Sequence, residues 1–125
     1  MGPSILIVDD VPSARKVMVN LLKRLGYTEL TEAPNGEVAL TLTQTKPFDA
    51  IISDWHMPKM DGLEFLAKLR EREGPSKEAP FLVVTSSGER DDVVTAIKSG
   101  VTDYISKPFT MGVLQGKIES MLKRN

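Results

Sequence analysis

The sequence predicts an α/β fold in which five helices cover a single, doubly wound sheet of five parallel strands. Short apolar runs alternate with helical patterns from one end of the chain to the other, and such alternation is typical of parallel strands joined by right-handed helical crossovers. Three of the runs are apolar on consecutive residues, as expected for strands with helices on both faces. The length, 125 residues, suits one domain.

The first half of the chain contains three of the predicted strands, at residues 5–8, 29–33 and 48–53. A helix is predicted to begin at Pro12, because the first helical turn tolerates proline, and to end at Gly26. The pair Asn35-Gly36 is typical of a hairpin. Here the apolar residues that follow it recur at helical spacing, which predicts a loop and a second helix instead.

The second half begins with a loop rich in Pro and Gly, at residues 54–62. Two further strands are predicted at residues 81–84 and 103–106. The remaining helices are marked by apolar stripes at 63–69, 93–97 and 111–122, with Gly100 closing the second of them.

Composition excludes several classes of function. The 16 basic and 17 acidic residues are intermixed and give a net charge of −1, which argues against a nucleic-acid or membrane-surface partner. The chain has no cysteine, which excludes disulfides and thiol chemistry and fits a reducing compartment. No export signal or membrane span is evident, so we expect a cytoplasmic protein. We also expect a monomer. We expect one domain over residues 1–125, with residues 1–3 disordered or added by cloning.

Residues suited to phosphoryl chemistry follow four of the predicted strands. They are Asp9 and Asp10, Asp54, Thr85, and Lys107. In doubly wound sheets, ligands bind beyond the carboxyl ends of the strands. Carboxylates crowded there repel one another, and a hard dication such as Mg²⁺ relieves the repulsion. The negative charges of the three carboxylates equal the positive charges of one Mg²⁺ and Lys107. Phosphorylation would replace one carboxylate charge with a phosphoryl charge of about −2, and this excess requires further hydrogen-bond donors such as Thr85.

Each of these residues has an ordinary interpretation when taken alone. An Asp after a strand is usually a helix cap or a turn former, a Thr is ordinary strand filler, and a Lys is solvated. Their joint occurrence at the correct strand ends favours the phosphoryl site by roughly ten to one.

The chain resembles the receiver domain of two-component response regulators. The resemblance rests on residues 5–10, 53–62, 83–85 and 104–109, and extends over essentially the whole chain. Within the family, the Asp54-Trp55 pair and Tyr104 are similar to stand-alone chemotaxis regulators. The resemblance implies a flavodoxin-like sheet of strand order 2-1-3-4-5 and a cis Lys107–Pro108 bond.

The resemblance also implies a role for each site residue. Asp54 would accept the phosphoryl group from a histidine kinase, while Asp10, Asp54 and the backbone carbonyl of His56 would bind Mg²⁺ or a substituting Mn²⁺, with Asp9 acting through water. Thr85 and Lys107 would bind the phosphoryl group. Tyr104 would rotate inward when Thr85 moves. His56 and Ser87 would modulate dephosphorylation. An output surface for a flagellar switch protein would comprise Arg90, Val93, Tyr104, Ser106 and Lys117, and a phosphatase is a further expected partner.

Other functions stay open at this point. One is the receiver of a response regulator outside chemotaxis, and another is a degenerate receiver that serves only as an interaction module. An aspartyl-phosphate phosphohydrolase would place an acid two residues after the nucleophile, where this chain has His56. A flavodoxin-type cofactor binder would need a phosphate cradle where this chain has the repelling pair Asp9-Asp10. We therefore expect no enzyme activity beyond phosphorylation and dephosphorylation of Asp54 itself.

Overall fold

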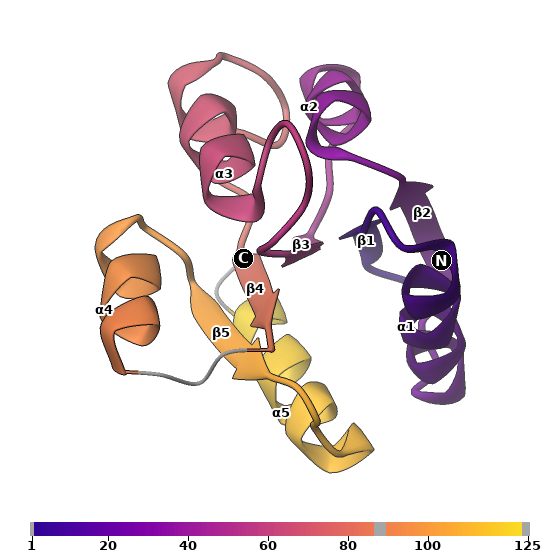
Figure 1. The fold of residues 1–125 in the computed structure, drawn as a ribbon. Helices are drawn as coiled ribbons and strands as arrows, with labels where there is room; N and C mark the ends of the chain where they lie inside the picture. The colour runs from indigo at the N-terminus through magenta and orange to yellow at the C-terminus, as the bar shows by residue number, and fades with distance from the viewer. Residues whose placement is uncertain (1, 87–89, 124–125) are drawn as a thin grey trace.

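The computed structural model describes residues 2–86 and 90–123, with the side chains of all of these except Arg90 and Asp91. It contains one parallel sheet of five strands in the order β2-β1-β3-β4-β5 (Figure 1). The predicted fold class and strand order are therefore confirmed.

The strands are β1 (Ser4–Val8), β2 (Glu29–Ala33), β3 (Ala50–Asp54), β4 (Phe81–Thr85) and β5 (Asp103–Ser106). The helices are α1 (Pro12–Arg24), α2 (Gly36–Thr45), α3 (Gly62–Glu71), α4 (Arg90–Lys98) and α5 (Met111–Leu122). Gly26 and Gly100, which follow α1 and α4, have φ values of 97° and 93°. Glycine adopts this left-handed conformation without the steric cost of a Cβ, which explains why both helices stop where predicted.

The third strand differs from its prediction, because it begins at Ala50 rather than at Phe48. The Phe48 N–H donates to the Ser76 hydroxyl at 2.8 Å instead of joining the strand ladder. The Phe48 side chain is nevertheless buried in the core, so its apolar character is explained by packing alone.

The core has two layers, one on each face of the sheet. Helices α1 and α5 cover one face, while α2, α3 and α4 cover the other (Figure 1). Since strand side chains alternate between faces, Ile7, Ile52 and Ile105 pack beneath α1 and α5, whereas Leu6 and Val83 face the other three helices. Full burial of each such side chain contributes about 1.5–3 kcal/mol.

The same alternation continues past the ends of the strands. On the α1–α5 face, Asp9 follows Ile7 by two residues, Asp54 follows Ile52, and Lys107 follows Ile105. Each row of buried apolar side chains thus leads to a charged residue at one edge of the sheet. Within the described residues, no helix is both long and apolar enough to cross a membrane.

Gly62, the first residue of α3, lies against the end of β3. A Cβ at this position would be 2.5 Å from the Asp54 carbonyl oxygen and 3.1 Å from the Trp55 Cα. These are backbone atoms that cannot move aside cheaply. We therefore expect Gly62→Ala to lower the free energy of unfolding by about 1–3 kcal/mol, measured by urea denaturation.

Gly116, inside α5, provides the matched control because a Cβ there would meet no atom within 4 Å. Gly116→Ala should raise the free energy of unfolding by about 0.5–1 kcal/mol, since alanine loses less backbone entropy in a helix. Equal effects of the two substitutions would contradict the close approach at Gly62.

Candidate functional site

Three carboxylates meet at the carboxyl edge of the sheet. Strands β1 and β3 are parallel neighbours in which Val8 pairs with Ser53, so the next residues, Asp9 and Asp54, emerge side by side. One oxygen each of Asp9, Asp10 and Asp54 lies within 4.8 Å of the others. Asp9 is buried, and Asp10 and Asp54 are partly buried. The structure therefore brings the three acids together as the strand-end argument predicts.

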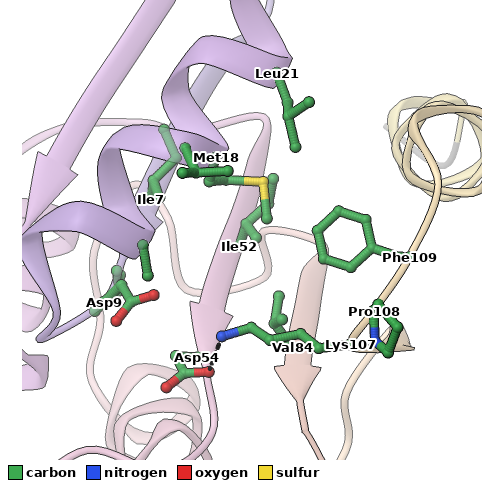
Figure 2. A pocket seen from close by; sticks show the side chains of 13 residues that line it. Ile7, Asp9, Met18, Leu21, Ile52, Asp54, Val84, Lys107, Pro108 and Phe109 are labelled. Atoms are coloured by element: carbon green, nitrogen blue, oxygen red, sulfur yellow. Dashed lines mark ion pairs between the residues drawn. The ribbon is translucent and has the colours of Figure 1, made fainter.

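Lys107 joins this cluster from β5. Its backbone N–H donates to the Thr85 carbonyl at 2.8 Å, which continues the β4–β5 pairing by one residue. Its ammonium lies 3.5 Å from Asp54 Oδ1 (Figure 2). The Lys107–Pro108 bond is cis, as predicted.

The environment of Asp54 disfavours its ionised form. Burial is the largest cause that raises the pKa of this carboxyl. Lys107 lowers the pKa in turn, while the charges of Asp9 and Asp10 raise it, and the net direction is upward. An ionised Asp54 is thus incompletely compensated by the protein alone, and a cation beside it is favoured.

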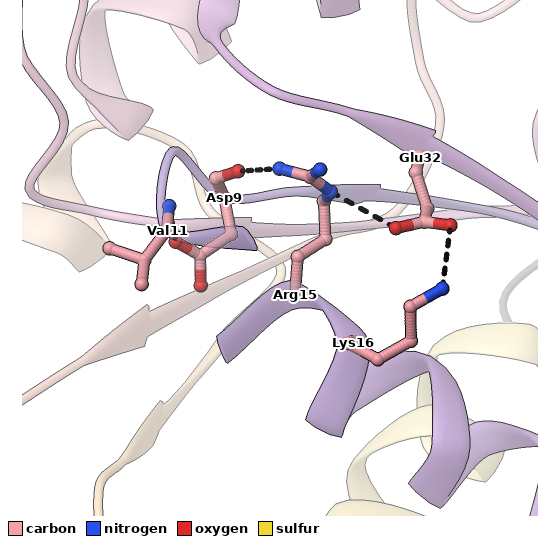
Figure 3. Close-up of polar contacts among 5 residues, drawn as sticks. All are labelled: Asp9, Val11, Arg15, Lys16 and Glu32. Carbon is pink, nitrogen blue, oxygen red and sulfur yellow. Dashed lines mark hydrogen bonds and ion pairs between the residues drawn. The ribbon is translucent and has the colours of Figure 1, made fainter. Parts of the chain in front are cut away.

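Asp9 is held from two sides (Figure 3). The Val11 N–H donates to Asp9 Oδ1 at 2.9 Å, and the Arg15 guanidinium donates to the Asp9 backbone carbonyl at 2.7 Å. Arg15 is held in turn by Glu32 on β2, with 3.0 Å between Nε and Oε1, and Lys16 lies 4.0 Å from the same carboxylate. This network fixes the turn that presents Asp9 and Asp10.

Arg15 is a residue of the site that the sequence pattern does not mark. Its partner Glu32 is on β2, distant in the sequence, and an arginine in the first turn of an amphipathic helix looks like an ordinary solvated residue. No local pattern marks it; only the pairing of β1 with β2 brings the two side chains together.

The loop after Asp54 is anchored at both ends. The Trp55 N–H donates to the Val84 carbonyl at 2.9 Å, and the Gly62 N–H donates to the Trp55 carbonyl at 2.7 Å. Asp61 and Glu64 form a reciprocal capping box that starts α3. His56 is exposed, and its ring stacks on Trp55 at a centroid distance of 5.2 Å. The structure thus gives the His56 ring a packing contact outside the carboxylate cluster.

Thr85 and Tyr104 lie on the face of the sheet opposite to Asp54 and Lys107. Tyr104 pairs with Val83, and Thr85 follows Val83 by two residues on the same side. Thr85 is 2% exposed, and Tyr104 packs at the edge of the core beneath α2, α3 and α4. The two side chains therefore lie diagonally on neighbouring strands, as the predicted movement of Tyr104 with Thr85 requires.

Within the predicted output surface, Lys117 is already paired. Its ammonium lies 2.9 Å from Asp103 Oδ1 and 5.2 Å from the centre of the Tyr104 ring. Val93, Tyr104 and Ser106 are partly exposed. Two other predicted positions, Ser87 and the Arg90 side chain, lie outside the described residues.

The fold and this edge of the sheet define the class of protein. The family sequence model described as the response regulator receiver domain matches residues 5–119. The chain therefore belongs to the receiver domain family of two-component response regulators. The family predicted from the motifs is confirmed. It is a family of signalling domains, not of enzymes.

Within this family, the chain is similar to chemotaxis proteins. It is 42% identical to the chemotaxis protein CheY of Pseudomonas aeruginosa over 120 residues, which are 96% of each chain. It is 40% identical to CheY1 of Helicobacter pylori over 122 residues, covering 97% of this chain and 98% of the relative.

Solved structures of receiver proteins have the same fold as this chain. CheY4 of Vibrio cholerae superposes with a TM-score of 0.88 at 32% identity, covering 98% of this chain and 100% of that one. The receiver domain of a Pseudomonas aeruginosa sensor histidine kinase, solved with a magnesium ion coordinated in its active-site cleft, gives 0.88 at 28% identity over 98% and 99% of the two chains.

The raised pKa of Asp54 predicts how stability depends on pH. The folded protein holds this proton more tightly than the unfolded chain, in which the pKa of the carboxyl is about 3.9. Stability contributed by protonated Asp54 is full below that pH and is lost as the pH rises through the folded pKa. In metal-free buffer at neutral pH, Asp54→Asn should therefore unfold at higher urea concentration than the wild type, with the difference vanishing at low pH.

Glu29→Gln is the control, because it removes one negative charge from an exposed side chain at the start of β2. It should leave the urea midpoint nearly unchanged across the same pH range. A destabilised Asp54→Asn variant at neutral pH would show that the Lys107 ion pair outweighs burial and repulsion.

Proposed function

We propose that Asp54 is the phospho-acceptor of a magnesium-dependent receiver that takes its phosphoryl group from a histidine kinase. The observation that carries the proposal is the cluster of Asp9, Asp10 and Asp54, whose oxygens lie within 4.8 Å of one another, with Lys107 3.5 Å from Asp54. Asp54 ends a central strand, so its carboxylate is held in place by the sheet. Lys107 then offers a cation to the incoming phosphoryl oxygens.

Magnesium fits this donor set. The three side chains offer only carboxylate oxygens, which are the ligands that Mg²⁺ and Mn²⁺ take in proteins. Asp10 and Asp54 would bind the ion directly with the His56 carbonyl, and buried Asp9, already accepting from Val11, would act through water. When bound, the ion neutralises charge on the acceptor and the phosphoryl group.

Phosphorylation would be read out through Thr85 and Tyr104. Adding a phosphoryl group of about −2 to Asp54 demands hydrogen-bond donors at the strand ends, and Thr85 ends the neighbouring strand β4. A shift of Thr85 would free space on the face where Tyr104 lies. His56, exposed beside the acceptor, and Ser87 would set the rate of dephosphorylation, which is the only other reaction we assign to the chain.

Chemotaxis is the signalling pathway that the relatives support. The two curated relatives, from Pseudomonas aeruginosa and Helicobacter pylori, are named chemotaxis proteins and match over nearly the whole chain. We accordingly propose a single receiver domain over residues 1–125 that works as a cytoplasmic monomer. Its partners would be a histidine kinase, a flagellar switch protein and a phosphatase.

The direct test is phosphorylation by acetyl phosphate with Mg²⁺, followed by mass spectrometry. The wild type should gain one phosphoryl group, and Asp54→Asn should gain none, because the amide cannot attack phosphorus. Chelating the metal should abolish labelling, and Asp10→Ala should weaken Mg²⁺ binding more than Asp9→Ala.

Trp55 follows Asp54 directly and is buried, so its fluorescence gives an independent readout of metal binding. Full labelling of Asp54→Asn would refute the assignment of the acceptor. Labelling of the wild type that proceeds equally in excess chelator would refute the role of the metal.

The output surface predicts long-range effects of phosphorylation. Chemical-shift changes should reach Val93 on α4, Tyr104 on β5 and Lys117 on α5, and Tyr104→Ala should reduce those on the two helices. Coupling of this kind is typically worth about 1–3 kcal/mol, so phosphorylation should tighten binding of the target roughly 5–150-fold.

Labelling of Tyr104→Ala is measured in parallel, so that loss of phosphorylation is not mistaken for loss of coupling. Shift changes confined to the carboxylate cluster would place the output surface elsewhere. They would favour a receiver that functions outside chemotaxis.

A further inference from the structure

A cavity of about 400 Å³ lies beside Asp54, between the sheet, α1 and the segment that joins β5 to α5 (Figure 2). Its walls are formed by Ala14, Met18 and Leu21 of α1, by Ile52 of β3, and by Phe109 after the cis Lys107–Pro108 bond. Sites for small molecules usually measure about 300–1,000 Å³ and have mostly apolar walls. The cavity is therefore large enough for a small ligand.

Charge in the lining is confined to one end of the cavity. Asp9, Asp54 and Lys107 line that end, and the other described lining residues are apolar. Phe109 and Leu21 lie toward the opposite end in Figure 2. The Asp54 carboxylate and Lys107 thus border a cavity that is otherwise largely apolar.

We propose that this cavity holds the leaving group of a small-molecule phosphodonor, and that the preferred donors are acyl phosphates with an apolar chain of about four to six carbons. This inference rests on the proposed role of Asp54. A ligand with an anionic phosphoryl head and an apolar tail complements both ends of the cavity. Lys107 meets the head, and the α1 side chains with Phe109 cover the tail.

The transfer step balances without a further reactant. An Asp54 carboxylate oxygen attacks phosphorus and forms the new P–O bond, while the P–O bond to the acyl group breaks. The electron pair of that bond leaves with the acyl oxygen, so the product is a fatty carboxylate and needs no proton from the protein. Because attack is in line, the leaving chain lies on the side of phosphorus away from Asp54.

Burial of the chain raises the second-order rate constant. The tail contacts the cavity equally in the bound donor and in the transition state, so its burial adds to kcat/KM. Each buried methylene should contribute about a four-fold increase. Butyryl phosphate should therefore react roughly sixteen-fold faster than acetyl phosphate, and the increase should level off once the chain outgrows the cavity.

The experiment compares initial rates of phosphorylation with acetyl, butyryl, hexanoyl and decanoyl phosphate at saturating Mg²⁺. The readout is the ratio of the hexanoyl rate to the acetyl rate within each protein. Ala14→Leu and the more flexible Ala14→Met both add carbons at a position that lines the cavity, and each should lower this ratio at least about four-fold.

Asn20→Leu is the matched control, because residue 20 is on α1 but is exposed and does not line the cavity. Its ratio should equal that of the wild type. Circular dichroism and urea midpoints of the variants confirm that each compared protein is folded.

Binding without transfer gives a second readout. Hexylphosphonate carries a similar anionic head but cannot transfer a phosphoryl group, and calorimetry should show that it binds the wild type at least ten-fold more tightly than methylphosphonate, an order of magnitude set by the buried methylenes. Ala14→Leu should remove most of this difference.

The possible results distinguish failure of the donor preference from failure of the proposed phospho-acceptor role of Asp54. Failure of acetyl phosphate to label Asp54 would refute the proposed function. Normal labelling with a hexanoyl-to-acetyl ratio near one, or a ratio that survives both Ala14 substitutions, would overturn the donor preference alone.

Discussion

The central constraint on this protein is the repulsion among three carboxylates that the sheet holds close together at one edge. One carboxylate oxygen each of Asp9, Asp10 and Asp54 lies within 4.8 Å of the others, and Lys107 beside them compensates only part of their charge. Burial adds to the cost and raises the pKa of Asp54. A site in this condition favours a bound dication, and an added phosphoryl group changes its charge balance enough to demand new donors.

The scaffold tolerates this crowding because it is rigid where the acids emerge. Parallel pairing of β1 with β3 sets Asp9 beside Asp54, and Arg15, braced by Glu32, fixes the backbone carbonyl of Asp9. Close packing of Gly62 against the end of β3 places α3 directly against that strand. Carboxylates on flexible loops would move apart to reduce their repulsion, and a bound cation would then stabilise them less.

Alternation of side chains along the strands gives the two faces of the sheet different tasks. On the α1–α5 face, buried isoleucines lead to Asp54 and Lys107, and the cavity beside Ala14 lies on this face. On the other face, Thr85 and Tyr104 lie on neighbouring strands. The carboxylate cluster with Lys107 and the pair of Thr85 and Tyr104 thus lie on opposite faces of adjacent strands, next to one another at the strand ends. A partner at the proposed output surface would meet Lys117 already paired with Asp103 rather than as a free cation.

The sequence by itself determined the fold class, the order of elements and the acids of the site. Apolar runs on consecutive residues and helical stripes depend on local pattern, and the rule that ligands gather at the carboxyl ends of strands converts Asp9, Asp10, Asp54 and Lys107 into one cluster. Tertiary structure alone decided the start of β3, the contacts of Arg15, the pairing of Lys117, and the cavity beside Asp54. Each of these depends on contacts between segments distant in sequence, such as Phe48 with Ser76. Periodicity reports which face of an element is buried, but the partner that buries it is fixed only when the strands and helices pack.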